Sequence, residues 1–316
     1  MVGRGVVRGA VFVALGATFY GVLGNVIKLA YRDGYTTAEV TGAQYALGLV
    51  GLLLVNRFTR GRQGGPVHLS GRDARQLVLA GTAIGITSVS YYISMLYIDV
   101  SVAIVLMMQS VWFGIVLESV INRRFPGWRK AVATVAILGG TLLATNALGS
   151  HRPLDARGVL WGLFSGATFT FMMFTSNRIA VHVPPLRKSL LMLLGGSTVV
   201  AAFVLMAQIG PHHIPALRSW LPGQGLGAVR AFNPSIFLSY GPVIALFGTI
   251  IPPIFFNIGF PKVGLGLGSI VSSLELPVSV SVAFLVLHEQ VVAVQWTGIA
   301  LILAAIVFMN ARGAAR

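Results

Sequence analysis

The feature that most constrains this chain is the recurrence of apolar segments about twenty residues long along its whole length. A helix rises about 1.5 Å per residue, so about twenty apolar residues cross the roughly 30 Å hydrocarbon core of a bilayer. The sequence therefore predicts an all-α integral membrane protein with ten transmembrane helices. The ten segments cover approximately residues 9–30, 37–56, 75–97, 100–121, 130–149, 157–180, 187–209, 235–259, 263–287 and 292–311.

The charged residues predict the orientation of the helices. The chain is 55% hydrophobic and only 10% charged, yet its formal net charge is +15. The cations lie in short connections between apolar segments rather than in one patch, which argues against a nucleic-acid partner. With the amino terminus inside, 17 of the 23 Lys and Arg residues fall on the cytoplasmic side. This bias predicts a multi-pass protein of the cell's inner (plasma) membrane with both termini cytoplasmic.

Several chemistries are excluded by residue usage. The chain has no cysteine, so disulfides and thiolate metal sites are impossible. His212 and His213 are adjacent but have no third ligand at a recognisable spacing, so we predict no metal and no cofactor. A Walker-type nucleotide loop is also missing from the sequence, so ATP is not expected to act directly.

An internal repeat divides the chain into two halves, 1–150 and 151–316. The sequence Gly-Ala-Thr-Phe occurs in the first segment at 16–19 and in the sixth at 166–169. Each half contains five segments, and an odd number means that the second copy enters the membrane from the opposite side. The sequence therefore predicts two inverted five-helix repeats, an architecture that lets a transporter open alternately to each side.

Segment 263–287 has one ionisable residue, Glu275, at its centre. A carboxylate at bilayer depth is costly unless it is protonated, paired or facing a watery cavity, so Glu275 is a candidate site residue. On a continuous helix, one small and polar face would look inward. That face comprises Gly264, Gly268, Ser272, Glu275 and Ser279.

Prolines predict interruptions near these polar groups. Pro277 removes a helical hydrogen bond and leaves the carbonyl group of Ser273 without its usual donor. The Pro252-Pro253 pair should interrupt segment 235–259 near its centre, and Asn257 lies about one turn later. Such breaks occur in membrane helices beside cavities.

Further polar side chains within the apolar segments are candidates for solute contacts, with hydrogen bonding between helices as the alternative. Glu118 and Glu289 are interpreted as structural, and Lys28 and Arg178 as long side chains that reach the interface. The solute-contact candidates besides Glu275 and Ser272 are Tyr20, Asn25, Tyr91, Gln109, Trp112 and Asn257.

The end of the chain resembles the EamA-type repeat of the drug/metabolite transporter superfamily. The residues that carry the resemblance are Glu275-Leu-Pro-Val278, His288-Glu289, Gln295-Trp-Thr-Gly298 and Leu301-Ile-Leu303. The resemblance implies a small-metabolite carrier, often an amino-acid exporter, with a central cavity lined by spans 1, 3, 4, 6, 8 and 9.

The two halves depart from each other at the corresponding motif. The first half has Trp112 and Arg124 where the second has Pro277 and Glu289, and His288 replaces the family's usual glycine. Solute contacts therefore cannot be transferred from one half to the other by symmetry.

The leading hypothesis is a secondary transporter of a small organic solute, in a lipid bilayer, with a midplane site. Desolvation disfavours a charged carboxyl group, so Glu275 is also the candidate for proton coupling. The alternatives are an uncoupled facilitator or exchanger, organic-cation or drug efflux and, more remotely, a lipid-modifying membrane enzyme. Such an enzyme would need clustered acids or histidines, whereas the eight acids here are scattered. A complete pair of repeats requires no oligomer to close its cavity.

Overall fold

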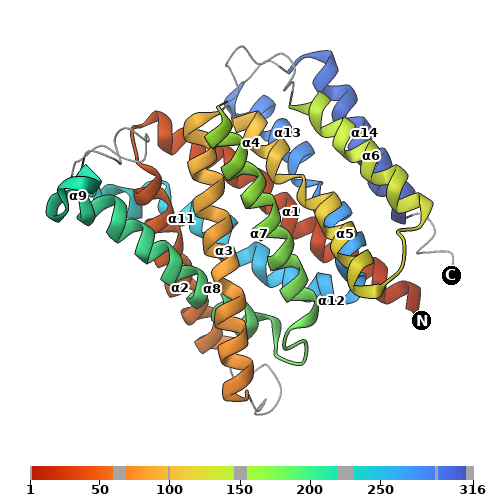
Figure 1. Cartoon of the computed structure of the whole chain (residues 1–316), viewed down its shortest axis with the longest axis horizontal. Coiled ribbons are helices and arrows are strands. Elements are labelled where there is room, and N and C mark those ends of the chain that lie inside the picture. The colour runs from red at the N-terminus through yellow and green to blue at the C-terminus, as the bar shows by residue number, and fades with distance from the viewer. Residues whose placement is uncertain are drawn as a thin grey trace.

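The computed structural model describes residues 2–59, 69–98, 100–145, 155–218, 231–288 and 291–310, and its regular elements there are all helical (Figure 1). Glu289 lies outside the described residues. The helices of the first half are α1 (Val2–Arg32), α2 (Thr37–Thr59), α3 (Gly71–Tyr97), α4 (Val100–Met107), α5 (Ser110–Asn122) and α6 (Trp128–Ala144).

The second half begins with α7 (Ala156–Arg178) and α8 (Pro185–Val204). A π-helical turn, η3 (Leu205–Ile209), joins α8 to the short α9 (Gly210–His213). The remaining elements are η4 (Pro234–Phe237), α11 (Gly241–Ala245), the π-helical η5 (Leu246–Ile250), α12 (Ile251–Ser272), α13 (Glu275–Leu287) and α14 (Ala293–Asn310).

Within the described residues, seven helical stretches are long and apolar enough to cross a membrane, and Ala293–Phe308 is a shorter apolar helix. The longest stretch, Gly241–Val286, has 46 residues and would measure about 69 Å if straight. Gly264 within α12 has φ 77° and ψ 169° and turns the chain. The stretch therefore corresponds to two of the predicted spans rather than to one. Glycine adopts this conformation without the strain that a side chain would cause. The all-helical membrane fold is thus confirmed.

Both halves contain a span that is broken in the same way. Two residues, Met108 and Gln109, separate α4 from α5, and Ser273 and Leu274 separate α12 from α13. The amide of Leu274 donates to Val271 and that of Gln109 to Leu106, both at 3.2 Å. These bonds reach back three residues instead of four, so each helix ends in a tight turn.

The helices after the two breaks also match in length and ending. Both α5 and α13 have 13 residues. Each ends at a left-handed residue, Arg123 with φ 50° and His288 with φ 53°. Ser110 and Glu275, the first residues of α5 and α13, are 165 positions apart, as are Arg123 and His288. The structure therefore supports the alignment that pairs Trp112 with Pro277.

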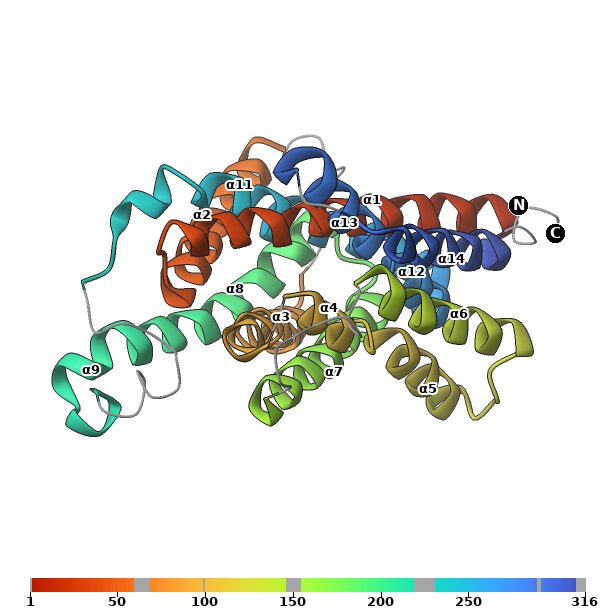
Figure 2. The ribbon, with the colours of Figure 1, turned by 90° about the horizontal axis from the view of Figure 1, so that it is seen from above.

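Helices from the two halves pack against one another across the molecule. Extensive contacts join α1 to α12, α3 to α8 and α6 to α14. Figure 1 and Figure 2 both show α14 lying along α6. At the α3–α8 contact, a Cβ atom on Gly81 would lie 1.9 Å from the carbonyl oxygen of Met192. The glycines at 81 and 85 therefore allow close contact between α3 and α8.

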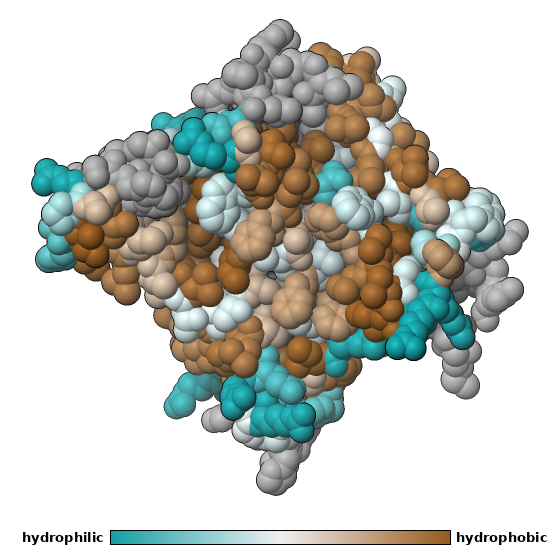
Figure 3. Space-filling model, viewed as in Figure 1, coloured by the Kyte–Doolittle hydropathy of each residue, from teal (hydrophilic) through white to brown (hydrophobic). Residues whose placement is uncertain are grey.

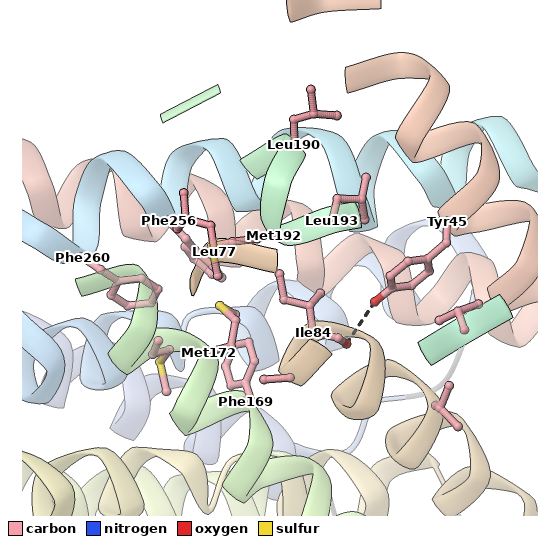
Figure 4. Packing of buried hydrophobic residues seen from close by; sticks show 14 of the residues in the cluster. Tyr45, Leu77, Ile84, Phe169, Met172, Leu190, Met192, Leu193, Phe256 and Phe260 are labelled. Carbon is pink, nitrogen blue, oxygen red and sulfur yellow. Dashed lines mark hydrogen bonds between the residues drawn. The ribbon is translucent and has the colours of Figure 1, made fainter. Parts of the chain in front are cut away.

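The surface and the interior are both largely apolar. Apolar side chains cover much of the visible helical face in Figure 3, and Val135 on α6 is 71% exposed. Such exposure is expected where lipid replaces water. Figure 4 shows the buried core, in which Phe256 and Phe260 of α12 lie near Phe169 and Met172 of α7.

Candidate functional site

A cavity of about 60 Å³ lies among α1, α2, α3, α4, α7 and α13. On a measure in which one water needs roughly 10–15 Å³, this space holds several waters or the polar end of a small solute. Seven of its sixteen lining residues are Leu, Ile, Met or Phe. The hydroxyl, amide and carboxyl groups come from Tyr20, Gln44, Thr87, Ser88, Tyr91, Tyr92, Glu275 and Ser279.

The cavity lies toward the end of the bundle where α3 ends. Its α3 residues run from Ile84 to Tyr92, in the second half of that helix. At the same end, the Ser94 hydroxyl donates to the carbonyl oxygen of Gly158, near the start of α7. At the opposite end, Asp73 near the start of α3 lies 3.4 Å from His182 in the α7–α8 turn. The α7–α8 turn is therefore at the end away from the cavity.

Glu275 reaches the cavity because the helix restarts there. It is the first residue of α13, which places Pro277 in the first turn of that helix, where a missing amide hydrogen is tolerated. The carbonyl group that Pro277 deprives of its usual donor, Ser273, accepts instead from the Leu276 amide at 3.2 Å. Close packing supports this restart, since Gly21 of α1 leaves room for the Glu275 carbonyl oxygen.

The carboxyl group of Glu275 is buried, with the residue only 9% exposed. Among the described residues, no donor or cation is paired with it. Tyr20 and Tyr91 lie close enough to interact with it electrostatically, and their hydroxyl groups also have no hydrogen-bond partner in the described chain. One acid and two hydroxyl groups therefore converge on the cavity with their hydrogen-bonding capacity unused.

The other polar groups in the wall are held in place. Tyr92 donates to the side-chain oxygen of Gln44 at 2.8 Å, which links α3 to α2. Behind the wall, Tyr45 of α2 donates to the carbonyl oxygen of the lining residue Ile84 at 3.0 Å, as Figure 4 shows. On α1, the ring of Tyr20 packs against Phe256, with centroids 5.5 Å apart. The wall is therefore preorganised around the unpartnered groups.

Of the predicted site residues, Glu275, Tyr20 and Tyr91 line the cavity. Asn25 lies next to it: its amide nitrogen donates to the Ser279 carbonyl oxygen at 3.0 Å and so joins α1 to α13. Ser272 does not contribute to the lining, because the break at Ser273 and Leu274 divides the predicted face. Its hydroxyl group donates to the Ser269 carbonyl oxygen at 2.8 Å.

Three other predicted contacts also lie outside the cavity wall. Gln109 donates to the Val105 carbonyl oxygen at 3.0 Å and accepts from the Trp112 indole at 2.8 Å. Trp112 is 36% exposed on the outer face of α5. The amide nitrogen of Asn257 donates to Ser189 at 2.9 Å, between α12 and α8. Their predicted roles in solute binding remain untested, and none of the three residues contacts this cavity.

The wall also differs from the expected set of spans. Span 2 contributes Gln44, and span 8 contributes no lining residue. The cause is packing: Thr249 of η5 donates to the Gln44 carbonyl oxygen at 3.2 Å, so η5 lies behind α2. Sequence reasoning missed Gln44, although an amide within an apolar segment was a signal that could have found it.

The burial of two charged residues was also missed. Glu39 at the start of α2 is fully buried and accepts from the Asn233 amide at 2.7 Å. Lys188, near the start of α8, is only 1% exposed. Its position beside Arg187 at a segment end made it resemble an interfacial lysine. Glu118, in contrast, forms the expected structural pair, with Lys130 as its partner.

These features define an integral membrane protein built of two similar helical halves around a small cavity with apolar and polar side chains in its wall. The EamA-like transporter family model matches residues 7–146 and 156–311, so the chain belongs to the EamA-like transporter family. The two matched segments together span most of the chain.

Comparison with solved structures supports the fold. One crystal structure of a protein matches with a TM-score of 0.67 and 13% sequence identity, covering 94% of this chain and 97% of the other. At that identity the likeness concerns the fold alone. No curated protein matches the sequence.

Proposed function

We propose that the protein is a secondary transporter that exports small organic solutes carrying an amine, such as amino acids, with Glu275 holding the amine or exchanging a proton. One observation carries the proposal: the buried carboxyl group of Glu275 faces a cavity without a partner among the described residues. A buried carboxylate is unfavourable until a proton or a cation joins it. A solute ammonium group supplies that cation.

The rest of the wall suits the body of such a solute. Tyr20, Tyr91 and Phe169 provide aromatic faces, which attract both apolar groups and cations. The unpartnered hydroxyl groups of Tyr20 and Tyr91 add donors and acceptors beside the carboxyl group. Leu, Ile and Met supply six of the remaining wall residues, so a compact apolar side chain fits better than a strongly hydrated one.

Movement of the solute is proposed to occur by alternating access. The matching breaks before Ser110 and Glu275 support an inverted pair of repeats, and discontinuous helices are typical at transporter midplanes. In this proposal both termini are cytoplasmic in the plasma membrane. Family membership favours transport over lipid-modifying chemistry.

Organic-cation or drug efflux is a second candidate, favoured by one observation. Among the described residues, no lysine, arginine or histidine lines the cavity. A solute with an amine and no carboxylate would therefore leave no charge unmatched there. An uncoupled facilitator or exchanger uses the same cavity and differs only in its response to a pH gradient.

Proteoliposome transport tests the proposal. Labelled amino acids, nucleosides and organic amines would be measured with and without a pH gradient, using wild-type protein and Glu275→Gln. We expect at least one amine-bearing solute to be carried, and its gradient-dependent transport to be lost in Glu275→Gln. Glu118→Gln is the matched control, because Glu118 is paired with Lys130 outside the cavity. Unchanged transport by Glu275→Gln would remove Glu275 from the mechanism.

A further inference from the structure

Three helices are joined by a closed triangle of hydrogen bonds near the α7–α8 turn. Lys188 of α8 donates to the Ser176 carbonyl oxygen of α7 at 2.8 Å. Asn177 of α7 donates to the Phe260 carbonyl oxygen of α12 at 2.6 Å. The triangle, which we call the clasp, is completed by the bond from Asn257 of α12 to Ser189 of α8 at 2.9 Å.

The charge of Lys188 is poorly compensated within the clasp. The residue is 1% exposed, and its ammonium group has three donors but a single acceptor in the described chain. No carboxylate is paired with it among the described residues. It also lies in the first turn of α8, where the helix dipole is unfavourable for a cation. An apolar side chain of similar size would fill this position without these costs.

Asn257 has the second polar group of the clasp with unused hydrogen-bonding capacity. It is 5% exposed, and its side-chain oxygen has no hydrogen-bond partner. Buried amide oxygens normally have a partner, because leaving one unpaired is unfavourable. The clasp thus offers spare N–H donors on a cation and a spare acceptor nearby on α12. A solute with a carboxylate beside an amine or hydroxyl group complements both.

The repeat relates the clasp to the wall of the cavity. The 165-residue offset that pairs Ser110 with Glu275 in the alignment of the two halves also pairs Tyr92 with Asn257. Tyr92 donates to Gln44, from the third span of its half to the second, and Asn257 likewise donates to Ser189 from the third span of its half to the second. The correspondence concerns the spans, because the same offset does not pair Gln44 with Ser189. Gln44 and Tyr92 line the cavity at one end of the molecule, whereas the clasp is closed at the other end. In inverted repeats, such elements exchange their open and closed arrangements.

We propose that Lys188, Ser189 and Asn257 form a second solute site, which binds the carboxylate of an amino- or hydroxy-acid solute. The site is closed in this structure and opens toward the α7–α8 turn when the cavity closes. This inference rests on the proposed transport function and extends it. Glu275 binds the amine of the solute in the cavity, and Lys188 binds its carboxylate at the second site.

Transport of two matched solutes tests the role of Lys188. Leucine and isoamylamine share the same apolar body and amine, and only leucine has a carboxylate. Lys188→Met is expected to slow leucine transport at least tenfold and to change isoamylamine transport less than twofold. Lys262→Met is the matched control, since Lys262 is an exposed α12 lysine over the Phe12 ring. Equal loss for both solutes, or no loss for leucine, would overturn the proposal.

Thiol labelling gives a second readout that needs no known solute. Because the chain has no cysteine, single cysteines can be introduced at Ser189 and at Val200, a buried residue farther along α8. In membranes exposing the α7–α8 side, an impermeant maleimide should label Ser189→Cys at least tenfold faster than Val200→Cys. Equal rates would refute the opening of the clasp. Failure of wild-type protein to carry any solute in the panel would instead refute the transport function.

Discussion

The two helix breaks share a backbone arrangement but differ in chemistry. Ser110 begins α5 and is fully buried against α7, where the Thr170 hydroxyl donates to its carbonyl oxygen at 3.3 Å. Glu275 begins α13 and faces the cavity. The first break is packed shut, and the second presents an acid to an open space.

This difference shows that the repeat determines the backbone at each break but not the side chains there. Hydrogen bonds between backbone groups define the breaks, so very different side chains can occupy corresponding positions. The solute site depends instead on local side chains, and the one carboxyl group in the cavity wall comes from the second half. The fold is close to symmetric, whereas the site is not.

The largest effect is expected when the acid is moved to the packed break. Ser110→Glu would bury a carboxyl group where no cavity receives it, at a cost of about 3–5 kcal/mol of folding free energy. Ser110→Ala should be nearly neutral, because the Ser110 hydroxyl oxygen has no partner. Unfolding in denaturant, measured in detergent, compares the two variants. Equal stability of Ser110→Glu and wild type would show that the first break also opens on a solvated space.

A smaller effect distinguishes the cavity from the helix contacts around it. Tyr91→Phe removes an unpartnered hydroxyl group from the wall, so we expect solute affinity to fall about fivefold to tenfold, about 1–1.4 kcal/mol, with stability unchanged. Tyr45→Phe removes a hydroxyl group that bonds the Ile84 carbonyl oxygen at 3.0 Å, so it should lower stability by about 1 kcal/mol and spare affinity.

Half-saturating solute concentrations and melting temperatures measure these two effects separately. If Tyr91→Phe lowered the melting temperature and left affinity intact, its hydroxyl group would be structural. The reverse result for Tyr45→Phe would place the solute deeper, toward α2 and Ser88.

Sequence patterns predicted the helices, because these depend on local composition, and they predicted an interruption near Pro277. They also identified Glu275 as a candidate site residue, since a single acid within an apolar segment is unusual. The burial of Lys188 could not be predicted, because a lysine at a segment end looks interfacial until its neighbours are known. Helical periodicity places a residue on a face, but it does not say which helix covers that face.

Gln109 and Trp112 show a related limit of sequence patterns, here for residues that were predicted to contact the solute. Their closeness at three residues apart was predicted, yet their side chains bond each other at 2.8 Å outside the cavity. A pair three residues apart on one helix can satisfy itself, and the sequence alone does not distinguish that outcome from a shared ligand.

The smallest expected effect concerns the origin of the break itself. The first break has Trp112 at the position of Pro277 and still forms, with the Val111 amide donating to Met108 at 3.0 Å. Its counterpart runs from Leu276 to Ser273 at 3.2 Å. Proline is therefore compatible with the break without being its cause. We expect Pro277→Ala to change the unfolding free energy by less than about 1 kcal/mol and to retain transport.

Spin labels on the exposed residues Lys262 and Leu285 test this expectation, because they lie on either side of the second break. Their separation should be the same in Pro277→Ala and in the doubly labelled wild type. Straightening of α12 into α13 would lengthen it and show that proline, unlike tryptophan in the first half, creates the break. An unchanged distance would mean that both halves break through the same backbone bonds, and that Glu275 is positioned by the repeat rather than by its neighbouring proline.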